Sequence, residues 1–151
     1  MDIELTGEQR MLAESVKAFV EEELLPLEVE AERAGQVSAE DGQRIKHKAL
    51  EMGLYAANLP ESVGGGGLDY TSLAIVEREL GKVSHALHGF AWRPTELLMA
   101  CNDEQKDRYL LPCVSGDKVE CFAITEPGAG SDIMSMATRA QRDGDDWIIN
   151  G

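Results

Sequence analysis

The spacing of apolar residues changes near Val119, and this change constrains the fold more than any other feature. Before it, apolar residues recur at helical spacing in five segments with no strand-like run between them. After it, short apolar runs alternate with turn residues. The sequence therefore predicts a mainly α protein with a β part. We expect an amino-terminal helical bundle over 1–118 and then the first strands of a β-barrel-like domain, truncated, over 119–151.

Capping residues and helix breakers set the expected helix boundaries. A capping box of Thr6 and Gln9 begins the first helix, and Pro26 is expected to kink or end it near Leu25. The other helices are expected over 38–53, 69–80, 84–100 and 102–116. Four glycines, at 64–67, follow the second helix. No lysine follows them as a phosphate-binding P-loop requires, so a flexible surface turn is the favoured interpretation.

Three strands are expected after Val119, over 121–125, 135–142 and 147–149. Asp143-Gly144 is a typical hairpin turn between the last two strands. Asn150-Gly151 is a second turn signal, and a turn serves to return the chain to a further strand. We therefore expect the sequence to be cut inside a β-domain.

The formal net charge of −14 opposes binding to nucleic acid and to anionic membranes, because no basic field attracts phosphate. Three cysteines without a CxxC spacing are interpreted as free, buried thiols in a reducing compartment. The first residues lack the apolar segment of a signal peptide. We expect a cytoplasmic protein without a membrane span.

The loop 125–132 carries the chemistry that the residues themselves suggest. Gly128 and Gly130 permit positive φ, so successive N–H groups can converge on an anion without any lysine. Pro127 stiffens the loop, and Thr125 and Ser131 supply hydroxyls. A plain β-turn accounts for the same residues equally well.

The run Phe122-Ala123-Ile124-Thr125-Glu126-Pro127-Gly128-Ala129-Gly130-Ser131-Asp132 resembles the signature segment of the acyl-CoA dehydrogenase family. Other segments resemble the same family in the same order. They are 5–9, 60–70, 103–116 and 147–151. The resemblance spans the chain but covers under half of a typical family member.

The resemblance implies FAD as cofactor, held with help from a neighbouring subunit in a homodimer or homotetramer. It places ten residues at the flavin and acyl-CoA site, namely Phe122, Ala123, Ile124, Thr125, Glu126, Pro127, Gly128, Ala129, Gly130 and Ser131. Thr125 is implied to hydrogen-bond the isoalloxazine edge, and Ser131 to contact FAD or the CoA chain. Glu126 and Asp132 are interpreted as residues that shape the loop.

The implied reaction is α,β-desaturation of an acyl-CoA thioester, with hydride transfer to the flavin and then electron transfer to an electron-transferring flavoprotein. The catalytic base is implied beyond Gly151, so the chain holds no catalytic residue and is expected to be inactive alone. An acyl-CoA oxidase or a flavin monooxygenase is an alternative, as is a truncated structural or partner-binding fragment.

Other candidates are weaker. His85 and His88 lie three residues apart, but no third ligand stands at a convincing spacing, so partly exposed polar residues are favoured and no metal site is predicted. Trp92 and Phe90 are candidates for an acyl cavity, although core packing is favoured. Met99 and Leu98 are ambiguous in the same way.

Overall fold

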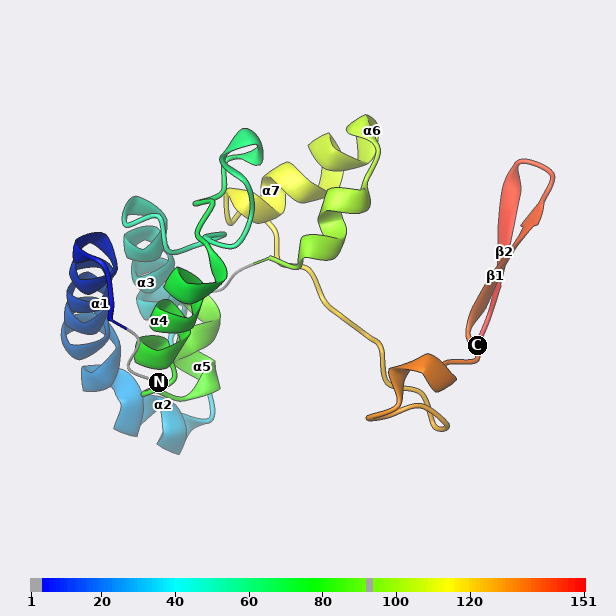
Figure 1. Ribbon diagram of the computed structural model, residues 1–151. Coiled ribbons are helices and arrows are strands. Elements are labelled where there is room, and N and C mark those ends of the chain that lie inside the picture. The colour runs from blue at the N-terminus through cyan, green and yellow to red at the C-terminus, as the bar shows by residue number, and fades with distance from the viewer. Residues whose placement is uncertain (1–3, 92–93) are drawn as a thin grey trace. The chain divides into compact units, whose positions relative to one another are not determined.

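The computed structural model describes residues 4–91 and 94–151, which form a mainly helical chain with a two-stranded antiparallel sheet (Figure 1). The α-helices are α1 (Gly7–Phe19), α2 (Glu28–Ala34), α3 (Ala39–Glu51), α4 (Tyr70–Leu80), α5 (His85–His88), α6 (Asp103–Gln105) and α7 (Leu111–Val114). The strands are β1 (Arg139–Asp143) and β2 (Asp146–Asn150). The chain divides into a helical unit up to Glu120 and a β unit from Cys121. The predicted fold class is confirmed.

Helix α1 begins as predicted. The Gln9 amide donates to Thr6 Oγ1 at 3.2 Å, and the Thr6 amide donates to Gln9 Oε1 at 3.1 Å, so both halves of the capping box are present. Of the two outcomes predicted for Pro26, an end of the helical path near Leu25 is not observed. A π-helical turn and a 3₁₀ turn, Val20–Leu24 and Leu25–Leu27, lead into α2 instead. The changed hydrogen-bond spacing accommodates a residue that cannot donate.

Helices α3 and α4 have the predicted boundaries. The Ser38 hydroxyl accepts from the Asp41 amide at 3.0 Å, and Gly53 follows α3 with a φ of +67°. Asp69 caps α4 by accepting from the Ser72 amide at 2.7 Å, and α4 ends at Leu80 as expected. Capping residues in these segments were therefore sufficient to predict both helices.

The single helix expected over 84–100 is wrong. Helix α5 stops at His88, a 3₁₀ turn covers Gly89–Ala91, and a separate 3₁₀ helix covers Glu96–Ala100. Pro94 lies between the two pieces, and a proline has no N–H to donate to the preceding turn of a helix. Trp92 lies outside the described residues.

The helix expected over 102–116 begins and ends as predicted but is not uniform. Asn102 and Gln105 form a second capping box, and Gly116 follows with a φ of +77°. A π-helical turn, Lys106–Leu110, separates α6 from α7 and precedes Pro112. The proline again coincides with a wider turn, which relieves the clash with the preceding carbonyl.

The four glycines form the predicted turn, and packing requires a glycine at the second of these positions. The Gly66 amide donates to Ala56 O at 3.1 Å, and the Gly67 amide to Leu59 O at 2.8 Å. A Cβ on Gly65 would lie 2.2 Å from the carbonyl oxygen of Leu59. The segment therefore lies against the backbone of 56–59 through hydrogen bonds, which the flexible turn of the prediction did not include.

The core of the helical unit lies where α1 and α4 pack together, with α3 and the 54–59 segment beside them. Its fully buried large side chains are Val16, Val20, Leu24, Ile45, Leu59, Leu80, Leu87 and Leu110. Phe90 packs on α3 so closely that a Cβ on Gly42 would lie 2.4 Å from the ring. No described helix is long and apolar enough to cross a membrane.

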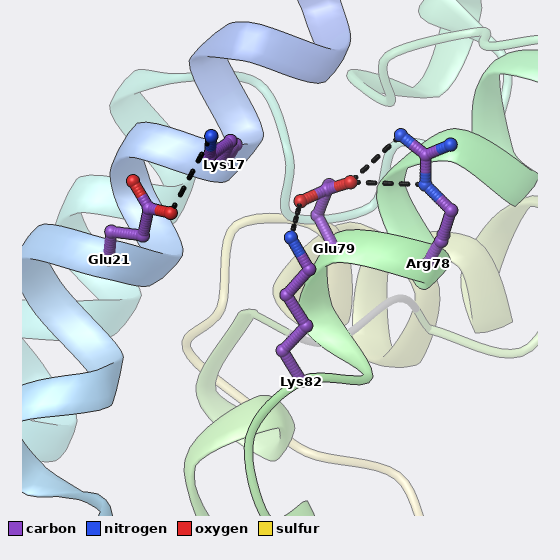
Figure 2. Close-up of polar contacts among 5 residues, drawn as sticks. All are labelled: Lys17, Glu21, Arg78, Glu79 and Lys82. Carbon is purple, nitrogen blue, oxygen red and sulfur yellow. Dashed lines mark hydrogen bonds and ion pairs between the residues drawn. The ribbon is translucent and has the colours of Figure 1, made fainter.

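A buried carboxylate pairs with two basic residues at the C-terminal end of α4. The side chain of Glu79 is 5% exposed, and it pairs with Arg78 at 2.9 Å and with Lys82 (Figure 2). These cations hold the pKa of Glu79 below its ordinary value, with the Lys82 hydrogen bond as the largest cause. The nearby pair of Lys17 and Glu21 is exposed on both sides.

The β unit contains one hairpin. Strand β1 pairs with β2 from Arg139 opposite Asn150 to Asp143 opposite Asp146, and Gly144 in the turn has a φ of +62°. The predicted turn and last strand are confirmed. The strand expected over 121–125 is wrong, and that expected over 135–142 begins only at Arg139 because a 3₁₀ turn covers Ile133–Ser135. A strand forms only where another strand pairs with it.

Candidate functional site

The segment 122–131 forms a tight turn inside the β unit. The Glu126 amide donates to Ala129 O at 3.1 Å, and the Ala129 amide donates to Glu126 O at 3.1 Å. Ala129 is 2% exposed, whereas the two residues between these positions face solvent. The structure thus brings Pro127 and Gly128 to the tip of the turn.

Gly128 and Gly130 do not adopt the positive φ that the sequence suggested, so this prediction is wrong. A Cβ added at either position would meet nothing within 4 Å. Neither conformation nor packing within the chain explains these glycines. At both positions the backbone is therefore open to close approach by another molecule.

The other predicted site residues surround this turn on an exposed surface. Phe122 is 61% exposed, and Thr125 and Ser131 are exposed hydroxyls on either side of the turn. Ile124 is partly buried, and Ala123 is exposed. Apolar surface, hydroxyls and an open backbone therefore lie within one short segment, which suits a large ligand with polar edges. The assignment of these residues to a cofactor stays a prediction.

Glu126 differs from its neighbours because its side chain binds the protein itself. Its Oε2 accepts from the Ala137 amide at 2.8 Å, and its Oε1 accepts from the Thr138 amide at 3.0 Å and from the Thr138 hydroxyl. These donors, the Thr138 hydroxyl foremost, lower the pKa of Glu126. Sequence reasoning named Glu126 as a loop-shaping residue but missed Thr138. A threonine just before a strand is too common a pattern to indicate a partner twelve residues away.

The histidines show a local pairing. The rings of His85 and His88 lie edge to face with centroids 5.9 Å apart, and His88 Nε2 lies 3.7 Å from Glu77 Oε2. Across residues 4–91 and 94–151, no group of three or more His, Cys, Asp or Glu is placed to hold a metal ion.

The thiols differ in environment. Cys113 is buried, and burial is the largest cause that raises its pKa, so this thiol is a poor nucleophile. Cys101 is partly buried and Cys121 is exposed. The prediction of burial is therefore right for Cys113 and wrong for Cys121, which begins the β unit.

A surface cavity of about 610 Å³ lies in the helical unit. Its wall includes Asn58, Tyr70, Leu73 and Met99. Asn58 donates to Pro94 O at 2.9 Å, while its buried Oδ1 has no partner. Phe90 packs against the core, which is the interpretation favoured from the sequence. Leu98 and Met99 also pack against the core, and Met99 lines the cavity as well. Phe90 does not line this cavity.

Comparison with known proteins identifies relatives for nearly the whole chain. A family model described as the acyl-CoA dehydrogenase N-terminal domain matches residues 6–117. The mitochondrial short-chain specific acyl-CoA dehydrogenase of Bos taurus is 35% identical over 99% of this chain. A 3-(aryl)acrylate reductase of Clostridium sporogenes is 32% identical over 97% of the chain. The chain spans 36% and 39% of the lengths of these two relatives.

A solved structure agrees with these relatives. The glutaryl-CoA dehydrogenase of Mycobacterium smegmatis, determined in complex with FADH2, matches with a TM-score of 0.78 and 28% identity. The match covers 97% of this chain and 38% of that one. Because the family model covers most of the residues and the relatives align from end to end of the sequence, the chain belongs to the acyl-CoA dehydrogenase family and contains its N-terminal domain.

Proposed function

We propose that this chain is part of an FAD-dependent enzyme that desaturates an acyl-CoA thioester between its α and β carbons. The observation that carries the proposal is the open backbone at Gly128 and Gly130, flanked by the exposed hydroxyls of Thr125 and Ser131. The family membership and the FADH2 bound to a related glutaryl-CoA dehydrogenase support a flavin as the ligand. The rest of the enzyme, including its base, lies outside the residues described.

In this proposal the chain's residues bind and orient the reactants. Thr125 donates to the edge of the flavin ring, and Ser131 contacts FAD or the CoA chain. The glycines allow the ring or its phosphates to approach the main chain, since no side chain projects between them. FAD supplies the hydride acceptor, and the protein supplies position and hydrogen bonds. An electron-transferring flavoprotein as acceptor, and a homodimer or homotetramer, belong to the same proposal.

Reduction of an α,β-unsaturated acyl group is a second candidate. The relative named a 3-(aryl)acrylate reductase matches 97% of the chain, nearly as much as the 99% that the dehydrogenase matches. The residues that bind the flavin do not set the direction of hydride transfer, because the same ring accepts or donates it.

The activity is tested with the complete protein. Mixing it anaerobically with butyryl-CoA, octanoyl-CoA and palmitoyl-CoA is expected to bleach the oxidised flavin band with at least one of them. Admitting oxygen then separates an oxidase or monooxygenase, whose flavin reoxidises rapidly, from a dehydrogenase. A flavin that none of the saturated thioesters reduces, but that returns electrons to an enoyl-CoA after chemical reduction, indicates the reductase.

The site is tested by Gly128→Ala. The φ of Gly128 is not positive and its surroundings are open, so the protein is expected to fold as the wild type does. A methyl group between backbone and flavin is expected to weaken FAD binding about tenfold or more. Flavin fluorescence measures this. Gly7→Ala, also in open space, is the matched control and is expected to leave FAD affinity unchanged. Equal affinity in both variants removes the turn from the site.

A further inference from the structure

The carboxylate of Glu126 closes a loop of the β unit. It accepts hydrogen bonds from Ala137 and Thr138, which are 11 and 12 residues further along the chain. Thr138 immediately precedes β1, the first strand of the hairpin. The side chain of one residue therefore ties the candidate site to the base of the only sheet found in the described residues.

The main chain of Glu126 makes a second tie at the same point. Its N–H and C=O both bond to Ala129, which fixes the turn of 126–129. The backbone of Glu126 thus belongs to the turn, and its side chain belongs to the approach to β1. Movement of the turn relative to the hairpin would break three hydrogen bonds to one carboxylate.

We propose that Glu126 is a positioning residue, whose carboxylate holds the 125–131 turn on the base of β1 so that its amides and hydroxyls are prearranged for the flavin. This inference rests on the proposed function. Both carboxylate oxygens are occupied by protein donors, so the group is engaged before any ligand arrives. A turn fixed in advance loses less conformational entropy when the ligand binds.

The charge of Glu126 supports this role and opposes direct contact with the ligand. A carboxylate facing a phosphate or the reduced flavin would repel it. Here two amides and a hydroxyl neutralise part of that charge, and they favour the ionised form of Glu126. The role therefore belongs to the pair of Glu126 and Thr138. Removing the carboxylate loses all three hydrogen bonds, and removing the Thr138 hydroxyl loses one of them, so the second change should have a smaller effect.

The test uses the complete protein with five variants: Glu126→Ala, Thr138→Val, the double variant that combines these two, Thr138→Ser and Asp145→Asn. Thr138→Val keeps the side-chain shape but removes the hydroxyl, so it weakens the tie with little risk to folding. Thr138→Ser restores the donor. Asp145→Asn removes an equal charge from the hairpin turn and serves as the control. The measurements are FAD affinity by fluorescence, the absorption spectrum of the bound flavin, and the rate of its anaerobic reduction against acyl-CoA concentration.

We expect Glu126→Ala to weaken FAD binding about tenfold or more, because hydrogen bonds to a charged group are lost. Thr138→Val should fall between this variant and the wild type, and Thr138→Ser should match the wild type. The double variant should lose less than the sum of the two, since both changes remove the same contact. An altered flavin spectrum with unchanged affinity for acyl-CoA distinguishes positioning of the flavin from general destabilisation.

Two failures are distinguishable. If the wild-type protein binds no FAD, the proposed function is wrong and this inference falls with it. If the wild type binds FAD and both Glu126→Ala and Thr138→Val bind it equally well with an unchanged spectrum, the inference alone is overturned. Weaker binding by Asp145→Asn to the same degree also overturns it, because net charge would then explain the effect.

Discussion

Glu79 places a charge inside the helical unit, and its two neighbours decide whether that charge is tolerated. The side chain is almost fully buried, while the side chains of Arg78 and Lys82 stay in contact with water, 63% and 44% exposed. The ionised form is favoured because the cations bond to it, and solvent screening of the exposed cations limits the gain. The group therefore stabilises the fold only while it is ionised.

The pH dependence follows from the lowered pKa of Glu79. The contribution is present above the ordinary carboxyl pKa of 4.5 and is lost as the pH falls through the lower pKa of the folded state. Glu79→Gln should therefore lower the free energy of unfolding by about 1 kcal/mol near neutral pH and by less in acid. Urea unfolding at neutral pH and at about pH 3 checks this. Glu21→Gln, in an exposed pair, should cost almost nothing.

The sequence predicted some of the residue-level features of the candidate site and missed others. The position of the 122–131 turn follows from Pro127 and the two glycines, which are local signals. The pairing of Glu126 with Thr138 was not predictable, because it depends on how residues 130–138 return to the turn. The conformation of Gly128 was misjudged since glycine permits positive φ without requiring it.

Prolines account for the largest differences between predicted and observed elements. Pro26 and Pro112 do not interrupt the helical path, because π-helical turns just before them absorb the missing hydrogen bond. Pro94 separates two short helices instead. Capping residues are local and were interpreted correctly, whereas the response to a proline depends on whether the next turn has a core to pack against.

The close packing of the 64–67 glycine turn predicts how substitutions there change stability. Gly65→Ala should destabilise the helical unit by about 2 kcal/mol or more, because the new methyl group would collide with the Leu59 carbonyl. Gly89→Ala should be neutral, since its surroundings are open and its φ is −57°. Denaturant unfolding followed by far-ultraviolet circular dichroism gives both values. Equal stability of the two variants would show that the 64–67 segment does not lie against 56–59.

Taken as a whole, the molecule contains two units that bury their side chains to very different extents. The helical unit buries a continuous core, whereas every residue of β1 and β2 is exposed. The exposed apolar side chains of the hairpin include Trp147, Ile148 and Ile149. A two-stranded hairpin without a covered face is marginal in water.

Hydrogen exchange on the 151-residue chain should separate the units. Amides of β1 and β2 are expected to exchange within the shortest labelling times, because the hairpin opens locally. Amides in the middle of α3 and α4 are expected to be protected up to the global stability of the helical unit. Mass spectrometry of peptic fragments resolves the two. Protection of the hairpin equal to that of α4 would mean that some surface covers it.

The contact between Gly42 and the Phe90 ring links two segments that are nearly fifty positions apart. The ring occupies the volume that a methyl group at position 42 would need. Relatives that carry a bulkier residue at the first position must therefore give up aromatic volume at the second, or move the 89–91 turn away from α3. The residues at the two positions are therefore expected to covary in size among homologues.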